Sequence, residues 1–112
     1  MNSRNQVQLI GNLGADSEFR PLNNGKSVAN AQLAISKYYK NSAGEEVNNT
    51  QWLRLTGWGK TAERMHRMMK KGAQVAIYGS IDISNYLDKE GNKKYSTSII
   101  VNDFVIVQKI KI

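Results

Sequence analysis

Residues 50–60 read TQWLRLTGWGK, and the alternation of apolar and polar side chains along them predicts a β-strand. One face of this strand would carry Leu53 and Leu55. The other would carry Trp52, Arg54, Thr56 and Trp58. The charge and the hydroxyl mark this second face as the one toward solvent, yet it holds both tryptophans of the chain. Because large aromatic side chains normally contribute most when buried, this placement favours a ligand with flat π-faces and negative charge. Single-stranded nucleic acid has both.

Length and composition indicate one globular domain with an excess of basic residues. The 112 residues fit a single domain over positions 1–112. Sixteen Lys and Arg against nine Asp and Glu give a net charge of +7, which favours a polyanionic partner, although a membrane surface suits the same charge. The absence of cysteine excludes disulfides, zinc ribbons and thiol nucleophiles.

Nothing in the sequence is typical of secretion or membrane insertion. Residues 1–8 are polar, so they lack the apolar run of a signal peptide. No stretch approaches the ~18 apolar residues that a membrane span needs. We therefore expect a cytoplasmic protein with no membrane partner.

Further alternating segments predict a mainly β protein. They cover residues 7–13, 28–37, 73–86 and 94–101, with a last strand segment over 104–112. Residues 61–71 instead place Ala62, Met65 and Met69 on one helical stripe, and Gly72 supplies the stop signal. The order β-β-β-α-β-β is that of the OB barrel. We therefore expect an all-β fold, a five-stranded OB barrel with one short helix between strands 3 and 4.

The predicted strands also assign faces and loops. In the strand over 73–86, the residues expected to face the core are Val75, Ile77, Ile81 and Ile83. Gly79 in its middle indicates a bulge or a bend. Residues 16–26 contain Pro21 and the turn sequence NNG at 23–25, so they are predicted to form a loop.

No pattern of catalytic or metal-ligating residues is present. The only histidine, His66, has no nucleophile or carboxylate arrangement near it in the sequence. The GKT at 59–61 lacks the earlier glycine of a phosphate-binding loop. The short acidic pairs at 16 and 18 and at 88 and 90 do not match calcium-loop spacing. We therefore expect neither an enzyme nor a metal site nor a cofactor.

Aromatic and basic residues recur in the same segments. Trp52 and Trp58 lie ~20 Å apart along a strand, so each could receive a different base of one extended strand. Tyr86 lies on the polar face of the fourth strand. Basic residues accompany these aromatics, with Arg54 between the tryptophans, Lys60 after the second, and Lys37 and Lys40 around Tyr38 and Tyr39. Tyr78 and Tyr95 are instead expected to pack under loops or at a subunit contact.

The chain resembles the bacterial single-stranded DNA-binding proteins, a homotetrameric OB-fold family of DNA replication, recombination and repair. The resemblance rests on VQLIGNLGADSEFR at 7–20, NGKSVANAQLA at 24–34, TQWLRLTGWGKTAE at 50–63, KKGAQVAIYGSI at 70–81 and YLDKEGNKKYSTSIIV at 86–101. It implies sequence-independent binding and protection of single-stranded DNA. It also implies a cytoplasmic, nucleoid-associated protein of bacterial origin.

The same resemblance assigns roles to particular residues. The family's base-stacking positions fall on Tyr39, Trp52, Trp58 and Tyr86. Its phosphate contacts fall on Arg54, Lys60 and Lys71, and Lys37 and Lys40 are further candidates beside the tyrosines. Subunit pairing is expected along the first strand, at Gln6, Val7, Gln8, Leu9 and Ile10. Alternation alone puts Tyr39 on the core side, so a bend would have to bring it to the surface.

The chain departs from the family pattern in two places. Residues 82–85 read DISN, where the family is usually rich in Arg and Lys, so one wall of the groove is less cationic and binding should be weaker. The chain also ends at Ile112, without the Gly/Pro/Gln-rich linker and acidic tip that usually recruit replication enzymes. We therefore expect a member of the family without the tail, and the sequence does not identify its replication-protein partners.

Two other functions remain possible from the sequence. One is a primosome-accessory-type OB adaptor, a dimer that binds single-stranded DNA and replication proteins. The other is an RNA-binding OB module. Mass in solution distinguishes the dimeric adaptor from the homotetramer. Competition between DNA and RNA oligomers distinguishes the RNA-binding module from a DNA-binding protein.

Overall fold

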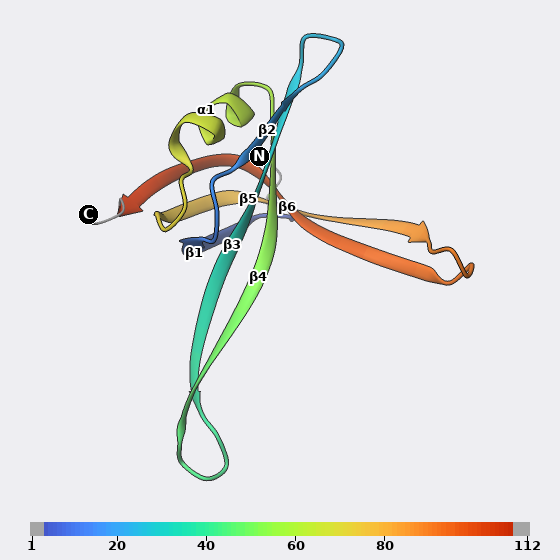
Figure 1. Cartoon of the computed structure of the whole chain (residues 1–112). Coiled ribbons are helices and arrows are strands. Elements are labelled where there is room, and N and C mark those ends of the chain that lie inside the picture. Colours follow the sequence, from blue (N-terminus) through green and yellow to red (C-terminus); the bar gives the residue numbers. More distant parts are fainter. Residues whose placement is uncertain (1–3, 109–112) are drawn as a thin grey trace.

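Five strands close a barrel in the computed structural model, which describes residues 4–108 (Figure 1). They are β1 (Val7–Leu13), β3 (Ser27–Lys40), β4 (Glu46–Trp58), β5 (Gln74–Leu87) and β6 (Lys93–Gln108). Their order is β1-β5-β6-β4-β3, and β1 closes the ring by pairing Asn12 with Ala34 and Leu13 with Leu33. The predicted five-stranded barrel is confirmed. The continuation of the last strand predicted over 109–112 lies outside the described residues.

A short additional strand, β2 (Glu18–Pro21), pairs with β3 outside the ring, where the sequence predicted a loop. Phe19 packs against the core, and its ring stacks on the ring of His66 with centroids 4.7 Å apart. Four residues are too few for alternation to stand out. Pro21 is tolerated because β2 is an edge strand.

The predicted helix is present as α1 (Lys60–Met68), between the third and fourth strands of the barrel. Its apolar stripe of Ala62 and Met65 is fully buried, and so is Met69 just after it. The helix ends earlier than expected because Met69 is already extended, with ψ at 99°. The chain then turns at Gly72, whose φ of +86° favours glycine. The described part of the chain has no helix long and apolar enough to cross a membrane.

The apolar core lies inside the barrel and under α1. Its largest fully buried side chains include Leu33, Leu55, Met65, Ile77 and Phe104. Gly57 leaves room for this packing, because a Cβ at that position would meet the sulfur of Met65. Leu55 and Val75 are buried as predicted from alternation.

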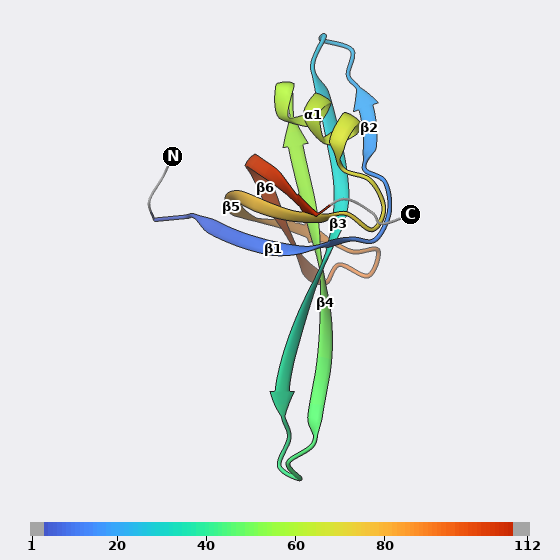
Figure 2. The same ribbon diagram turned by 90° about the vertical axis from the view of Figure 1, so that its left-hand side faces the viewer.

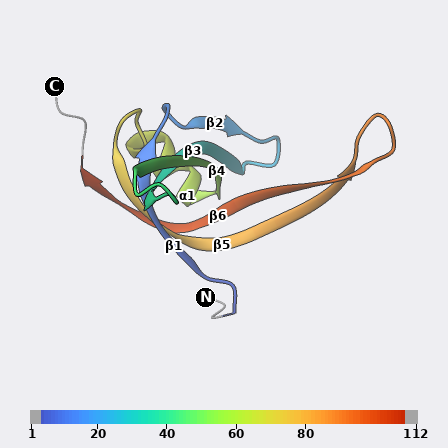
Figure 3. The same cartoon turned by 90° about the horizontal axis from the view of Figure 1, so that it is seen from below.

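Two predicted core residues are not in the core. Ile81 and Ile83 are 41% and 61% exposed. The reason is that β5 and β6 leave the barrel at the pair Ile81 and Ile99 and continue as a long hairpin, here called the β5–β6 arm (residues 82–98, Figures 1 and 3). The predicted irregularity at Gly79 is confirmed by a register shift between Tyr78 and Gly79, just before the arm begins.

The β3–β4 hairpin likewise leaves the barrel and forms a second arm, the β3–β4 arm (residues 36–50, Figures 1 and 2). This arm corrects the expectation that Tyr39 needs a bend to reach the surface. Tyr39 does continue the inward face of β3, but the core has ended before it, so the side chain is exposed.

An ion pair ties α1 to β6. Nη1 of Arg64 donates to Oδ1 of Asp103 at 2.9 Å, and the guanidinium lies 4.6 Å from the centroid of the Phe104 ring. This hydrogen bond holds the pKa of the Asp103 carboxyl below its ordinary value. A carboxyl pKa that is lowered by folding adds stability above its unfolded pKa, and the contribution is lost as the pH falls through the folded pKa. Since both side chains are partly exposed, the contribution is small.

Candidate nucleic-acid interface

The outer faces of β2, β3, β4, β6 and β5 form one continuous surface. Strand pairing aligns side chains of this surface in rows that cross neighbouring strands. One row is Arg20, Val28 and Trp58, the next is Glu18, Asn30, Thr56 and Ile100, and a third is Gln32, Arg54, Ser98 and Asp82. Residues far apart in the sequence are therefore adjacent on this face.

Trp58 stands at the end of β4 with 52% of its surface exposed. Its cross-strand neighbour Val28 is buried. A hollow of about 260 Å³ lies beside the indole. Barrel residues line one wall of the hollow and the β5–β6 arm lines the other, and its lining includes Arg20, Arg54, Trp58, Asp82, Ser84, Ser96 and Ser98. The hollow therefore combines an aromatic surface, two guanidinium groups and several hydroxyls.

Trp52 lies on the same face of β4 and is 56% exposed. Its indole is supported by the backbone of Gly14, in the segment between β1 and β2. A Cβ built on Gly14 would lie 2.6 Å from Cζ3 and 2.8 Å from Cη2 of the indole. A larger residue at position 14 would therefore displace the indole of Trp52 from this position.

Arg54 lies between the two tryptophans. It lines both the hollow beside Trp58 and a second one of about 200 Å³, which is bounded by Asp16, Glu18 and Gln32 among others. Next to it, Oγ1 of Thr56 donates to Oδ1 of Asn30 at 3.0 Å, and this hydrogen bond fixes two polar groups that line the hollow beside Trp58. Within residues 4–108, no carboxylate lies within ion-pair distance of Arg54. Its guanidinium is therefore available to an anion from outside.

Tyr86 projects from the β5–β6 arm on the same side as Asp82 and Ser84, because the three alternate along β5. It pairs across the arm with Lys94 and is exposed. Tyr95 belongs to the reverse side of the arm, where Nζ of Lys93 lies 6.0 Å from its ring centroid. Tyr86 therefore continues the surface that begins at Trp58.

Next to β5, β1 has an open edge. Its residues Val7–Gly11 pair with β5, whereas β3 reaches β1 only at Asn12 and Leu13. The side chain of Asn5 extends the pairing with β5, since it accepts from the N–H and donates to the carbonyl of Ile81. In the described part of the chain, the other edge of the strand thus keeps backbone groups that could pair with a further strand.

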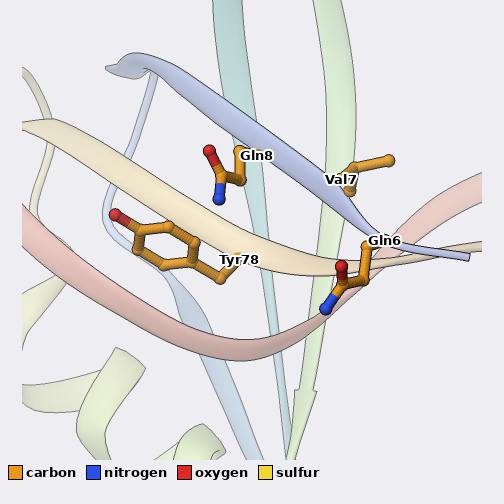
Figure 4. A pocket seen from close by; sticks show the side chains of 4 residues that line it. All are labelled: Gln6, Val7, Gln8 and Tyr78. Carbon is orange, nitrogen blue, oxygen red and sulfur yellow. The ribbon is translucent and has the colours of Figure 1, made fainter. Parts of the chain in front are cut away.

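The outer face next to this edge is partly apolar. Ile10, Ala76 and Val105 form a row across β1, β5 and β6, and both Ile10 and Val105 are exposed. Polar residues flank the row. Gln6, Val7, Gln8 and Tyr78 line a hollow of about 190 Å³ there (Figure 4). This mixture of apolar centre and polar margin is typical of protein–protein contacts.

Residues 4–107 match the model of the single-strand binding protein family. The chain belongs to this family. Single-stranded DNA-binding protein 1 of Chlorobaculum tepidum is 43% identical over 100 residues, which are 88% of this chain and 62% of the relative. Single-stranded DNA-binding protein 1 of Xylella fastidiosa is 36% identical over 110 residues, which are 97% of this chain and 81% of the relative. The chain thus spans less than two thirds of the Chlorobaculum relative.

Solved structures of the family share the fold. A Plasmodium falciparum SSB in complex with ssDNA superposes with a TM-score of 0.86 at 25% identity, over 96% of this chain and 98% of that one. A deletion mutant of the single-stranded DNA binding protein from Thermus aquaticus gives a TM-score of 0.80 at 24% identity. That match covers 93% of this chain and 50% of the other.

The residues that the family resemblance selected do not all lie on one face. Trp52, Arg54 and Trp58 lie together on β4, and Tyr86 faces the same side from the β5–β6 arm. Lys37 and Tyr39 continue the inward face of β3, so they lie on the reverse side of the β3–β4 arm. The structure therefore divides the predicted set between two faces.

The other three lysines of the predicted phosphate contacts, Lys40, Lys60 and Lys71, are exposed. Lys40 alternates onto the face of β3 that borders Trp52. Lys60 begins α1, two residues after Trp58. Lys71 lies beside the β1–β2 segment, because its backbone N–H donates to Oδ1 of Asp16 at 2.8 Å.

Sequence reasoning missed one basic residue of the interface, Arg20. It lies on β2, in the same row as Trp58, and lines the same hollow. It was missed because residues 16–26 were predicted to form a loop. The available signal was the single apolar Phe19 between the charged Glu18 and Arg20, which is a short alternation.

Proposed function

We propose that this chain binds single-stranded DNA without sequence preference and protects it during replication, recombination and repair. The observation that carries the proposal is the pair of half-exposed indoles of Trp52 and Trp58, with the guanidinium of Arg54 between them, which forms no ion pair within residues 4–108. The names of the two bacterial relatives and the ssDNA complex of the structural relative support it. A location at the bacterial nucleoid in the cytoplasm follows from this function.

Binding would combine stacking with neutralisation of phosphates. Bases would stack on Trp52, Trp58, Tyr86 and Tyr39. Phosphates would contact Arg54, Lys60, Lys71, Lys37 and Lys40, and Arg20 is a further candidate because it lines the hollow beside Trp58. Every base has a π-face, so stacking tolerates any sequence and contributes about 1–3 kcal/mol per base. These contacts involve no bond making or breaking, so the proposed role is binding without catalysis.

Asp82 would weaken this binding. It is the β5 member of the row that contains Arg54 and Ser98, and it lines the hollow beside Trp58. A carboxylate in a phosphate-binding groove repels the ligand backbone and offsets part of the attraction of Arg54. The low cationic charge of residues 82–85 is therefore expected to reduce affinity without removing it.

Titration with oligo-dT tests the proposed function. We expect tryptophan fluorescence to be quenched on binding, because Trp52 and Trp58 would both be in contact with bases. The logarithm of the affinity should fall linearly with the logarithm of salt concentration, with a slope of about −0.7 per neutralised phosphate. An unchanged emission at low salt and micromolar protein would refute the proposal. A clear preference for matched RNA in competition would replace DNA by RNA as ligand.

We further propose that the open edge of β1 pairs chains into a homotetramer. The residues concerned are Gln6, Val7, Gln8, Leu9 and Ile10. The β1 strand of a second chain could add to the edge by backbone hydrogen bonds and form a dimer. Where two such dimers meet, the apolar row of Ile10, Ala76 and Val105 would become buried.

The mass of the chain in solution checks this assembly. Sedimentation or light scattering should give four times the mass of one chain, which is 12.6 kDa. A stable dimer would instead favour the primosome-accessory type of adaptor. A monomer at all concentrations would contradict pairing through β1.

A further inference from the structure

We propose that Tyr38 is an additional base-stacking residue, which continues onto the β3–β4 arm the aromatic face that Trp58 and Trp52 form along β4. The inference rests on the proposed binding of single-stranded DNA. It names a residue that the family resemblance did not select, since the resemblance assigns the neighbouring position, Tyr39.

The register between β3 and β4 places Tyr38 on the face of the tryptophans. Trp52 pairs with Ala34, and four residues further along β3 Tyr38 pairs with Asn48. Residues at even spacing share a face, so Ala34, Tyr38 and Trp52 all point to the same side of the arm. The distance along the arm from Trp52 to Tyr38 is ~13 Å, shorter than the ~20 Å between the two tryptophans.

The same register separates Tyr38 from Tyr39. Tyr39 pairs with Val47 and belongs to the reverse side of the arm. The twist of a two-stranded ribbon turns both sides together, so it keeps these neighbours on opposite sides. A strand that follows Trp58, Arg54 and Trp52 along one face therefore meets Tyr38 directly, and it must cross the edge of the arm to reach Tyr39.

The surroundings of Tyr38 suit a ligand better than a structural role. It is 76% exposed, which is the largest value among the exposed large hydrophobic side chains of the described residues. No hydrogen bond or ring contact in the described part of the chain holds its phenol ring. Lys40 follows on the same face, and Tyr38, Tyr39, Lys40 and Glu46 line a hollow of about 500 Å³. A stacking platform thus lies next to a cation that can hold the adjoining phosphate.

A length series of oligo-dT with Tyr38→Ala tests the inference. The shortest oligonucleotide that fully quenches both tryptophans should bind the variant and the native chain equally well. Longer ones, which reach the arm, should bind the variant about tenfold more weakly. Tyr38→Phe keeps the ring and should restore the native affinity at every length.

Tyr95→Ala is the matched control. Tyr95 is also highly exposed, at 64%, but it belongs to the reverse side of the other arm. Its removal should leave the length series unchanged. If Tyr38→Ala binds every oligonucleotide with native affinity, the inference is overturned while the proposed function stays intact. The same holds if the main effect of Tyr38→Ala is a change in the mass of the assembly. Failure of the native chain to bind any oligonucleotide would instead refute the proposed function.

Discussion

Replacing Trp52 and Trp58 together by alanine is expected to lower the affinity for oligo-dT by about 100-fold or more. Each base stacked on an aromatic ring contributes about 1–3 kcal/mol, and 1.4 kcal/mol corresponds to a factor of ten. Both indoles are about half exposed, at 56% and 52%, so a base can reach each of them. The variant lacks tryptophan fluorescence, so binding is measured by the anisotropy of a labelled oligonucleotide.

The paired substitution of both tryptophans by phenylalanine separates stacking from folding. It keeps two aromatic faces and should retain most of the affinity. The alanine variant loses the buried half of each indole, so it should unfold at a lower urea concentration than the native chain, and its circular dichroism checks that it is still folded where affinity is measured. An affinity within threefold of the native value would show that the indoles do not carry binding.

The second large effect concerns stability. Gly79→Ala is expected to lower the free energy of unfolding by about 3 kcal/mol or more, the upper range for overpacking in a closely packed site. A Cβ at position 79 would collide with the backbone carbonyl oxygen of Ile100, on the neighbouring strand β6. A flexible side chain could move aside, but a strand carbonyl can move only if β5 and β6 separate where the arm leaves the barrel. Urea unfolding followed by circular dichroism measures the change.

Ser80→Ala is the control for this position. Ser80 follows Gly79 directly and lies on the face of the outer surface, so losing its hydroxyl should change the free energy of unfolding by less than ~0.5 kcal/mol. A Gly79→Ala variant as stable as Ser80→Ala would show that the strands adjust freely at the bulge.

Alternation predicted which faces of the strands are apolar, but it could not predict where the barrel ends. Leu55, Val75 and Ile77 were correctly expected to be buried, because each lies within the part of a strand that surrounds the core. Ile81 and Ile83 continue the same period and were wrongly placed inside. Whether an inward-facing residue has a core to face depends on strand lengths and on the crossing of distant strands, which a local pattern does not contain.

Like the core, the candidate interface was predictable only where one strand by itself determines it. The outward tryptophans and Arg54 follow from one strand read by itself. Arg20 joins them only because β2 pairs with β3, and the opposite orientations of Tyr38 and Tyr39 emerge only from the register of β3 against β4. Both features depend on pairing between segments, and a single strand carries no information about its partner's register.

The extension of the two hairpins beyond the barrel has an evolutionary consequence. Side chains on the arms, such as Tyr38 and Tyr86, have little neighbouring core to disturb, so replacing them should scarcely affect folding. Selection can therefore retune ligand preference at those sites while the barrel stays constant. Chains of this architecture should diverge fastest on the arms and slowest at positions such as Leu55 and Phe104.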